Sequence, residues 1–423
     1  YAELGHLAVH KGEVDAARKL FDKALEMDKR CVRAMAGWGR VHYTARHYKD
    51  ARTWLEKAHQ TDPRNLEAAV LLARTYNTIG LGGKAAVVLK ELRKIHPDAP
   101  EILLVLGEVE AAADNYDSAA KHLETLLKRA PENLQAYRQL ALVRIKQKQP
   151  EAALALLKRA AKQLPGSPEV RNLEGEVLLA LNKVDEARTK FSEALKLDKR
   201  LNVALFNLAS VLLEQDQLEQ ARKRFEELRS RDTNHPGLGH RMGVLYFKLE
   251  DYKKAAQAYA VALKEEQIPA ELRLDAADAY NLGGEQDKCL KQTKIAIAQD
   301  PTLSRGRAIR ARCLLDSGKR DDALVEIRQA VSRDPRPEYQ VILGDIQAAR
   351  GKIEEAVLAY TAALKESPDQ PQVRLRRARL WVQLGTVKQA SRDLEQLVKE
   401  LPKSAEAQVL LGRALSQLGK EKQ

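Results

Sequence analysis

The chain has 423 residues, of which 44% are hydrophobic and 31% are charged, and its formal net charge is +13 at pH 7. No apolar run approaches the roughly 18 residues that a membrane-spanning helix needs, and the three cysteines are too few for a disulfide framework. The positive charge permits nucleic acid, an acidic protein segment or an anionic surface as a partner, and by itself it selects none of them.

A small residue recurs every 34 residues, and a second small residue follows it in each unit. The first series is Gly5, Gly39, Ala73, Gly107, Ala141, Gly175, Ala209, Gly243, Ala277, Ala311, Gly344, Ala378 and Gly412. The second is Ala17, Ala51, Ala85, Ala119, Ala153, Ala187, Ala221, Ala255, Cys289, Ala323, Ala356 and Ala390. A bulky residue often lies four residues later, as at Phe21, Phe191, Phe225, Tyr259 and Tyr360. This fixed period predicts a stack of one unit, two amphipathic helices that touch at the small residues.

Prolines near the ends of most units support this division, because proline cannot continue the helix that it follows. They are Pro63, Pro97, Pro131, Pro165, Pro301, Pro335, Pro368 and Pro402, and a one-residue deletion lies between Pro335 and Leu343. The predicted units are 1–31, 32–65, 66–99, 100–133, 134–167, 168–201, 202–235, 236–269, 270–303, 304–336, 337–370 and 371–404, with a capping helix over 405–423.

With these residues, the sequence resembles the tetratricopeptide repeat proteins over essentially its whole length. The resemblance implies an all-α fold, a right-handed α-solenoid (superhelix) of antiparallel helix pairs whose inner groove is lined by the first helix of each unit. The family's Lys/Asn/Arg clamp for a terminal carboxylate is absent as a combined pattern, although Asn172 and Asn207 fall at groove positions. A role with chaperone tails is therefore not expected.

The first unit begins at Tyr1 inside its first helix without an initiator Met, so we expect a fragment or a processed form. His6 and His10 lie one turn apart on this helix, and His42 is the nearest further candidate ligand. A closed metal site needs more ligands than these, so no metal is expected.

Two glycine-rich stretches lie where each unit turns between its helices. Residues 80–84, GLGGK, lack the spacing of a phosphate-binding loop and follow a helix, so we interpret them as a turn, and 282–285, LGGE, likewise. Cys31, Cys289 and Cys313 are interpreted as separate, buried or incidental thiols. A cytoplasmic location fits, with the periplasm as the alternative.

Arginine is densest in the last three units. Arg310 and Arg377 take positions usually filled by leucine, so their stems are expected to pack while their charged ends reach solvent. The family's groove positions also hold acidic residues between basic ends. The candidate partner-binding residues in the groove are Arg305, Arg312, Arg376, Arg379, Arg413, Arg33, Arg40, Arg74 and Asn207.

The motifs of common enzyme classes are missing from the sequence, and no catalytic residue or cofactor is expected. We favour a scaffold that binds an acidic protein segment in its groove, as an adaptor in a bacterial envelope, pilus, secretion or motility assembly. The Ala/Leu/Arg-rich composition hints at a bacterial source. The alternatives are a nucleic-acid-binding helical repeat protein, although aromatic residues for stacking are scarce at 5%, and the interaction region of a larger enzyme.

Overall fold

The computed structural model describes residues 1–97, 99–264 and 268–419, and every regular element in these ranges is an α-helix. The expected all-α class is confirmed. The chain divides into two compact units, Tyr1–Leu212 and Leu213–Gln423, and the division falls within α13. Each unit is described by itself, and one continuous array over the whole chain stays a prediction.

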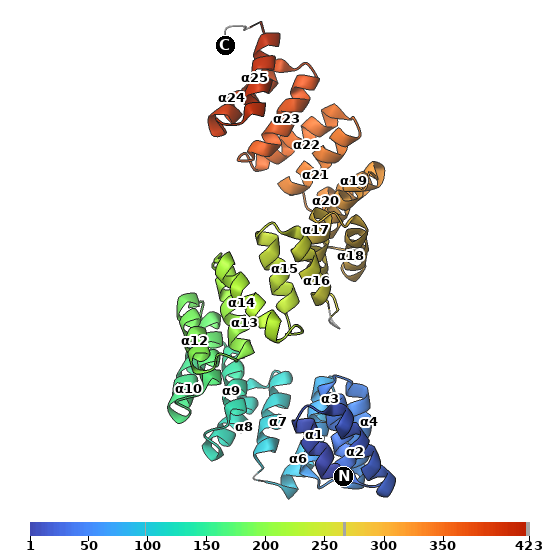
Figure 1. The fold of residues 1–423 in the computed structure, drawn as a ribbon, viewed down its shortest axis with the longest axis vertical. Helices are drawn as coiled ribbons and strands as arrows, with labels where there is room; N and C mark the ends of the chain where they lie inside the picture. Colours follow the sequence, from blue (N-terminus) through green and yellow to red (C-terminus); the bar gives the residue numbers. More distant parts are fainter. Residues whose placement is uncertain (98, 265–267, 420–423) are drawn as a thin grey trace. The chain divides into compact units, whose positions relative to one another are not determined.

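Within each unit the helices follow one another in antiparallel pairs, and the first helix of a pair packs on the second (Figure 1). The first unit contains α1 (Ala2–His10), α2 (Val14–Met27), α3 (Val32–Thr44), α4 (Tyr48–Thr61), α5 (Leu66–Thr78), α6 (Gly82–Ile95), α7 (Pro100–Ala112), α8 (Tyr116–Arg129), α9 (Leu134–Lys146), α10 (Pro150–Gln163), α11 (Pro168–Ala180) and α12 (Val184–Leu197). Across the division lies α13 (Asn202–Glu214).

The second unit continues in the same manner. It contains α14 (Leu218–Arg231), α15 (Leu238–Lys248), α16 (Tyr252–Ala262), α17 (Ala270–Leu282), α18 (Gln286–Gln299), α19 (Ser304–Asp316), α20 (Arg320–Arg333), α21 (Pro337–Ala349), α22 (Ile353–Glu366), α23 (Pro371–Gln383), α24 (Val387–Glu400) and α25 (Ala405–Gln417). No helix in the described ranges has the length and apolar character needed to cross a bilayer.

The same tight turn joins the two helices of each pair. A residue with positive φ follows the first helix at every turn, namely Gly12, Arg46, Gly80, Asp114, Lys148, Asn182, Asp216, Glu250, Gly284, Gly318, Gly351 and Gly385. This left-handed residue ends the helix and lets the next backbone N–H reach back to a free carbonyl, as Leu81 N donates to Tyr76 O at 2.8 Å. The interpretation of 80–84 as an inter-helix turn is confirmed for Gly80 and Leu81, whereas Gly82, Gly83 and Lys84 form the first turn of α6.

The small and bulky series pack against each other as the period predicts. A Cβ added to Gly243 would lie 2.7 Å from the ring of Tyr259, and one added to Gly175 would lie 2.5 Å from the ring of Phe191. Ala255 on the second helix of the eighth pair is fully buried. The helices of a pair therefore approach so closely that a larger residue at these positions must displace its neighbours.

We expect Ala255→Leu to lower the free energy of unfolding by about 1–3 kcal/mol, because extra methylenes in a filled contact force the helices apart. Urea unfolding followed by far-ultraviolet circular dichroism measures the effect. The control is Val261→Leu on the same helix, whose side chain is exposed. A variant as stable as the unchanged chain would contradict the proposed register.

The expectation of separate thiols is wrong for two of the three cysteines. Cys289 on α18 and Cys313 on α19 form a disulfide, with their Cα atoms 6.4 Å apart, whereas Cys31 is free. The two residues lie 24 positions apart, and packing of successive helix pairs brings them together. Because disulfides persist mainly in oxidising compartments, the cysteines no longer favour a cytoplasmic location.

Candidate functional site

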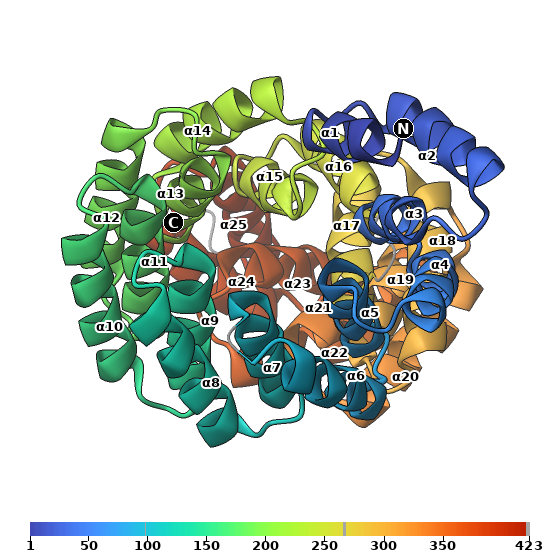
Figure 2. The same ribbon diagram turned by 90° about the horizontal axis from the view of Figure 1, so that it is seen from below.

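The odd-numbered helices line one face of each unit. Successive odd-numbered helices contact one another, as α5 does α7 and α7 does α9 in the first unit, and α17 does α19 in the second. Within the first unit, α7, α9 and α11 lie on the inner side of the curved array and α8, α10 and α12 on its outer side (Figure 2). We call the exposed side of the odd-numbered helices the inner face, and it holds the residues predicted to bind a partner.

The three predicted arginines of the first unit are paired across the inner face. Each contacts a carboxylate of an adjacent odd-numbered helix: Arg33 that of Glu3, Arg40 that of Glu67 at 2.6 Å, and Arg74 that of Glu108 at 3.1 Å. Arg74 donates through both Nε and Nη2, so this pair is bidentate. Burial raises the pKa of Glu108, although the charge of Arg74 opposes this. These arginines connect neighbouring pairs of helices and are not free cations.

Asn207 also belongs to a network between adjacent helices. Its Nδ2 donates to Asn172 Oδ1 at 3.0 Å and to Glu176 Oε1 at 3.2 Å, and Asn172 Nδ2 donates to the same Glu176 oxygen at 2.8 Å. Beside this network lies a hollow of about 170 Å³, lined by Leu134, Gln135, Arg138, Glu169, Asn172, Leu173 and Val203. Ligand pockets for small molecules are larger, about 300–1,000 Å³, so the hollow suits a single side chain.

In the second unit, Arg305 is surrounded by carboxylates of α17. Its guanidinium lies 2.9 Å from Glu271, 2.7 Å from Asp275 and 3.1 Å from Asp278. Burial raises the pKa of Asp278, with the Arg305 charge opposing. Burial also acts to raise the pKa of Asp275, but hydrogen bonds from His240 and Arg305 outweigh it and lower that pKa. Arg305 is thus a connector between α17 and α19 more than an open anion site.

The arginines of α23 are paired as well, but they are more exposed. Arg376 donates to both oxygens of Asp345, at 2.8 and 2.7 Å, and Arg379 contacts Glu406 on α25. Their side chains remain 45% and 49% exposed. Asp345 therefore neutralises part of the arginine cluster and holds one of its rotamers.

Two of the predicted partner-binding arginines differ from the others because, in the part of the chain that the structure describes, they are not part of an ion pair. Among the described residues, Arg312 and Arg413 have no ion-pair partner within 4.0 Å. Arg312 is half-buried on the inner face of α19, where its charge opposes the rise in the pKa of Asp278 that burial causes, and Arg413 is exposed on α25. They are the predicted cations most available to an incoming anion.

The expectation for Arg310 and Arg377 is wrong, because their charged ends contact carboxylates of the following helix. Arg377 Nε and Nη2 each donate to Asp393 at 2.8 Å, and the two side chains are 16% and 12% exposed. Arg310 Nε donates to Glu326 at 3.1 Å. Each arginine thus replaces the usual leucine with a largely buried ion pair between the two helices of one repeat.

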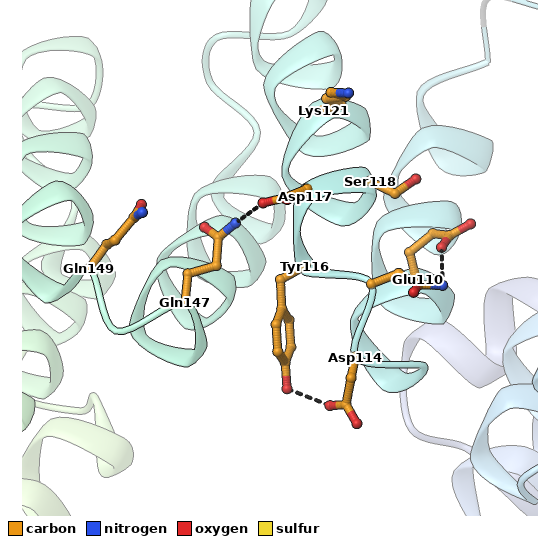
Figure 3. A pocket seen from close by; sticks show the side chains of 9 residues that line it. Glu110, Asp114, Tyr116, Asp117, Ser118, Lys121, Gln147 and Gln149 are labelled. Atoms are coloured by element: carbon orange, nitrogen blue, oxygen red, sulfur yellow. Dashed lines mark hydrogen bonds between the residues drawn. The ribbon is translucent and has the colours of Figure 1, made fainter.

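A hollow away from the inner face lies at the α7–α8 and α9–α10 turns (Figure 3). It measures about 740 Å³ and is lined by Glu110, Asp114, Asn115, Tyr116, Asp117, Ser118, Lys121, Gln147 and Gln149. Several of these side chains are already satisfied, since Asn115 donates to Glu110 at 3.0 Å and Gln147 to Asp117 at 2.7 Å. We interpret this hollow as a polar surface between turns.

Family models described as "Tetratricopeptide repeat" match most of the chain. The matched residues are 45–107, 80–143, 110–177, 144–200, 178–240 and 347–414 for one model, and 3–65 and 310–371 for another. The chain is 20% identical over 260 residues to the "BBSome complex member BBS4 homolog" of Drosophila melanogaster, covering 58% of this chain and 53% of that protein. It is 24% identical over 374 residues to "Tetratricopeptide repeat protein 21A" of Mus musculus, covering 86% of this chain and 27% of that one.

The chain thus spans about half or less of the length of these relatives. Among solved structures, the anaphase-promoting complex hetero-tetramer Cut9–Hcn1 matches with a TM-score of 0.47 and 13% identity, covering 97% of this chain and 95% of that chain.

Proposed function

Because the chain belongs to the tetratricopeptide repeat family, whose fold is typically a non-enzymatic interaction scaffold, we propose that it binds an extended segment of a partner protein along the inner face. One observation carries this proposal: polar side chains of adjacent odd-numbered helices are held in place by one another beside a hollow the size of a single side chain. Preorganised donors and a small hollow suit an extended peptide, which offers a backbone and separate side chains.

On the second unit, we propose that the inner face binds an acidic partner segment. Arg312 lacks an ion pair in the described ranges, and the pairs of Arg376 and Arg379 are about half exposed. Exposed ion pairs stabilise a protein by only about 0–1 kcal/mol, so a partner's carboxylates can join or replace them at little cost. Guanidinium groups also match carboxylates in a planar, bidentate geometry. Arg305 contributes less directly, because three carboxylates already surround it.

The setting that we propose is a multiprotein assembly in which this chain is an adaptor. One matched relative is named as a BBSome complex member, which supports a subunit role of this kind. A bacterial envelope, pilus, secretion or motility assembly remains the more specific hypothesis, and it rests on composition alone.

Acidic peptides selected from a display library on the immobilised chain test the proposal. With one selected peptide, we expect Arg312→Glu combined with Arg379→Glu to weaken binding about tenfold or more, equivalent to about 1.4 kcal/mol. Fluorescence anisotropy of the labelled peptide measures the dissociation constant, which should also rise with salt because exposed charges are screened over about 8–10 Å.

The matched control is Arg328→Glu combined with Arg392→Glu, which makes the same charge change at exposed positions of α20 and α24. Equal weakening by both double variants would show that net charge alone drives binding. An unchanged affinity in the inner-face variant would move the site to the Arg33, Arg40 and Arg74 region. A third outcome would favour the nucleic-acid hypothesis, which the net charge of +13 supports. In that outcome no peptide is selected, and the unchanged chain binds arbitrary single-stranded RNA or DNA whereas the inner-face variant does not.

A further inference from the structure

We propose that His42, His47 and Asp50 form a binding site for a divalent metal ion of the zinc class at the turn between α3 and α4. In the described ranges these three side chains bring one ligand atom each to within 4.8 Å of one another. Imidazole nitrogens and a carboxylate oxygen are the ligands that Zn²⁺ takes in open, three-residue sites. The proposal does not depend on the proposed peptide binding.

The turn itself holds the ligands together. His42 lies in the last turn of α3, and His47 N donates to His42 O at 2.9 Å, so the two histidine backbones are hydrogen-bonded. Arg46 between them has a φ of 61°, the left-handed conformation that every such turn uses. Asp50 follows in the first turn of α4. The turn therefore fixes the backbone positions of the three ligand residues, which lowers the entropy lost on binding.

The His42 ring is held in place with one nitrogen unused. It stacks on Trp38, with ring centroids 5.4 Å apart and an interplanar angle of 26°. Its Nδ1 is buried and has no hydrogen-bond partner among the described residues, and it lies 4.0 Å from Asp50 Oδ2. Buried polar atoms are nearly always satisfied, so an unpartnered nitrogen facing a carboxylate at this distance points to an atom that bridges them.

The turn between α7 and α8, two repeats later, has the same backbone conformation but lacks histidines that could bind a metal ion. Glu110 and Asn115 take the places of His42 and His47 two repeats later, and Asn115 donates to Glu110 at 3.0 Å (Figure 3). That turn is closed by its own hydrogen bond. At the α3–α4 turn two imidazole rings occupy these places, with centroids 6.2 Å apart, and the His42 Nδ1 atom remains unpartnered.

Small side-chain movements convert this arrangement into a metal site. Ligand atoms about 2.0–2.1 Å from a tetrahedral Zn²⁺ are about 3.4 Å from one another. The observed separations of up to 4.8 Å must shorten, and the side chains of His47 and Asp50, which must move, are exposed. The fourth position stays open for water. The sequence-based expectation of no metal considered His42 with His6, but His6 Nε2 lies 3.0 Å from Arg33 O.

Calorimetric titration of the tag-free, EDTA-treated chain with ZnCl₂ tests the proposal. We expect one equivalent to bind, and His47→Gln and Asp50→Asn each to weaken binding by about tenfold or more. The control is His59→Gln, which makes the same change on α4 outside the group. CuCl₂ should also quench the total tryptophan fluorescence of the unchanged chain more than that of His47→Gln, because the bound ion lies beside the Trp38 ring that stacks on His42.

His47 and Asp50 are exposed, so matched circular dichroism melting curves will show that the variants are folded. The proposal is overturned if the unchanged chain binds no zinc at about 1 mM ZnCl₂, a level that detects even weak sites. It is equally overturned if His47→Gln and Asp50→Asn bind zinc with the affinity and stoichiometry of the unchanged chain.

Discussion

Replacing Phe191 with alanine should lower the free energy of unfolding of the first unit by about 3–5 kcal/mol. Phe191 on α12 is fully buried, and its ring lies directly beneath Gly175 of α11. Glycine leaves the space that the ring fills, so the alanine variant has no nearby side chain that can fill the resulting cavity. Urea unfolding followed by far-ultraviolet circular dichroism gives the free energy.

The control for this variant is Val87→Ala on α6, an exposed position where a change within about 0.5 kcal/mol is expected. Because each repeat contacts only its neighbours, amide hydrogen exchange should accelerate in α11 and α12 and change little in α1 and α2. Uniform acceleration throughout the first unit would contradict the nearest-neighbour architecture. A loss of less than about 1 kcal/mol would contradict the packing role of the ring.

Removing the carboxylate partner of Arg377 should have the second largest effect. We expect Asp393→Ala to lower the free energy of unfolding by about 3 kcal/mol, the lower end for a buried ion pair, because the pair keeps slight contact with solvent. The variant leaves a guanidinium that is only 16% exposed without its bidentate acceptor. The matched control is Glu406→Ala, which removes the partner of the exposed Arg379 and should cost at most about 1 kcal/mol.

A double replacement separates the pair's net contribution from the penalty for an isolated charge. Arg377→Leu combined with Asp393→Leu restores the leucine that this repeat position usually holds, so the double variant should be about as stable as the unchanged chain, or more stable. Thermal and urea unfolding of the unchanged chain, of Asp393→Ala and of the double variant measure this. If the double variant is instead as unstable as Asp393→Ala, the ion pair is the main stabilising interaction between α23 and α24.

The sequence alone was sufficient for the helix pairs, their packing residues and the turns between them. A solenoid repeats the same local contacts, so a residue such as Gly175 or Tyr259 reveals its role by recurring at a fixed spacing. The left-handed residue of each turn was not predicted where it is Arg46 or Asp114, because the backbone hydrogen bonds of the turn require that conformation whatever the side chain.

The state of the inner-face arginines was decided by the tertiary structure. The period placed Arg305 and Arg376 on the right helices, but each charge is balanced by a carboxylate about one repeat away, as Arg305 is by Glu271. A partial signal existed in the sequence, since Arg74 and Glu108 occupy equivalent positions of adjacent repeats, and so do Glu271 and Arg305. Ion pairing depends on rotamers across two packed helices, and a pattern within one repeat does not contain that information.

The same reason applies to the Cys289–Cys313 disulfide and to the group of His42, His47 and Asp50. Composition indicated too few cysteines and histidines for a framework, whereas the packing of α18 on α19 and the turn after α3 bring particular pairs together. Repeat spacing determines which residues face each other on average. Only the positions of the side chains themselves decide which of them are close enough to bond, because a bond forms over a few ångströms and a repeat spans many.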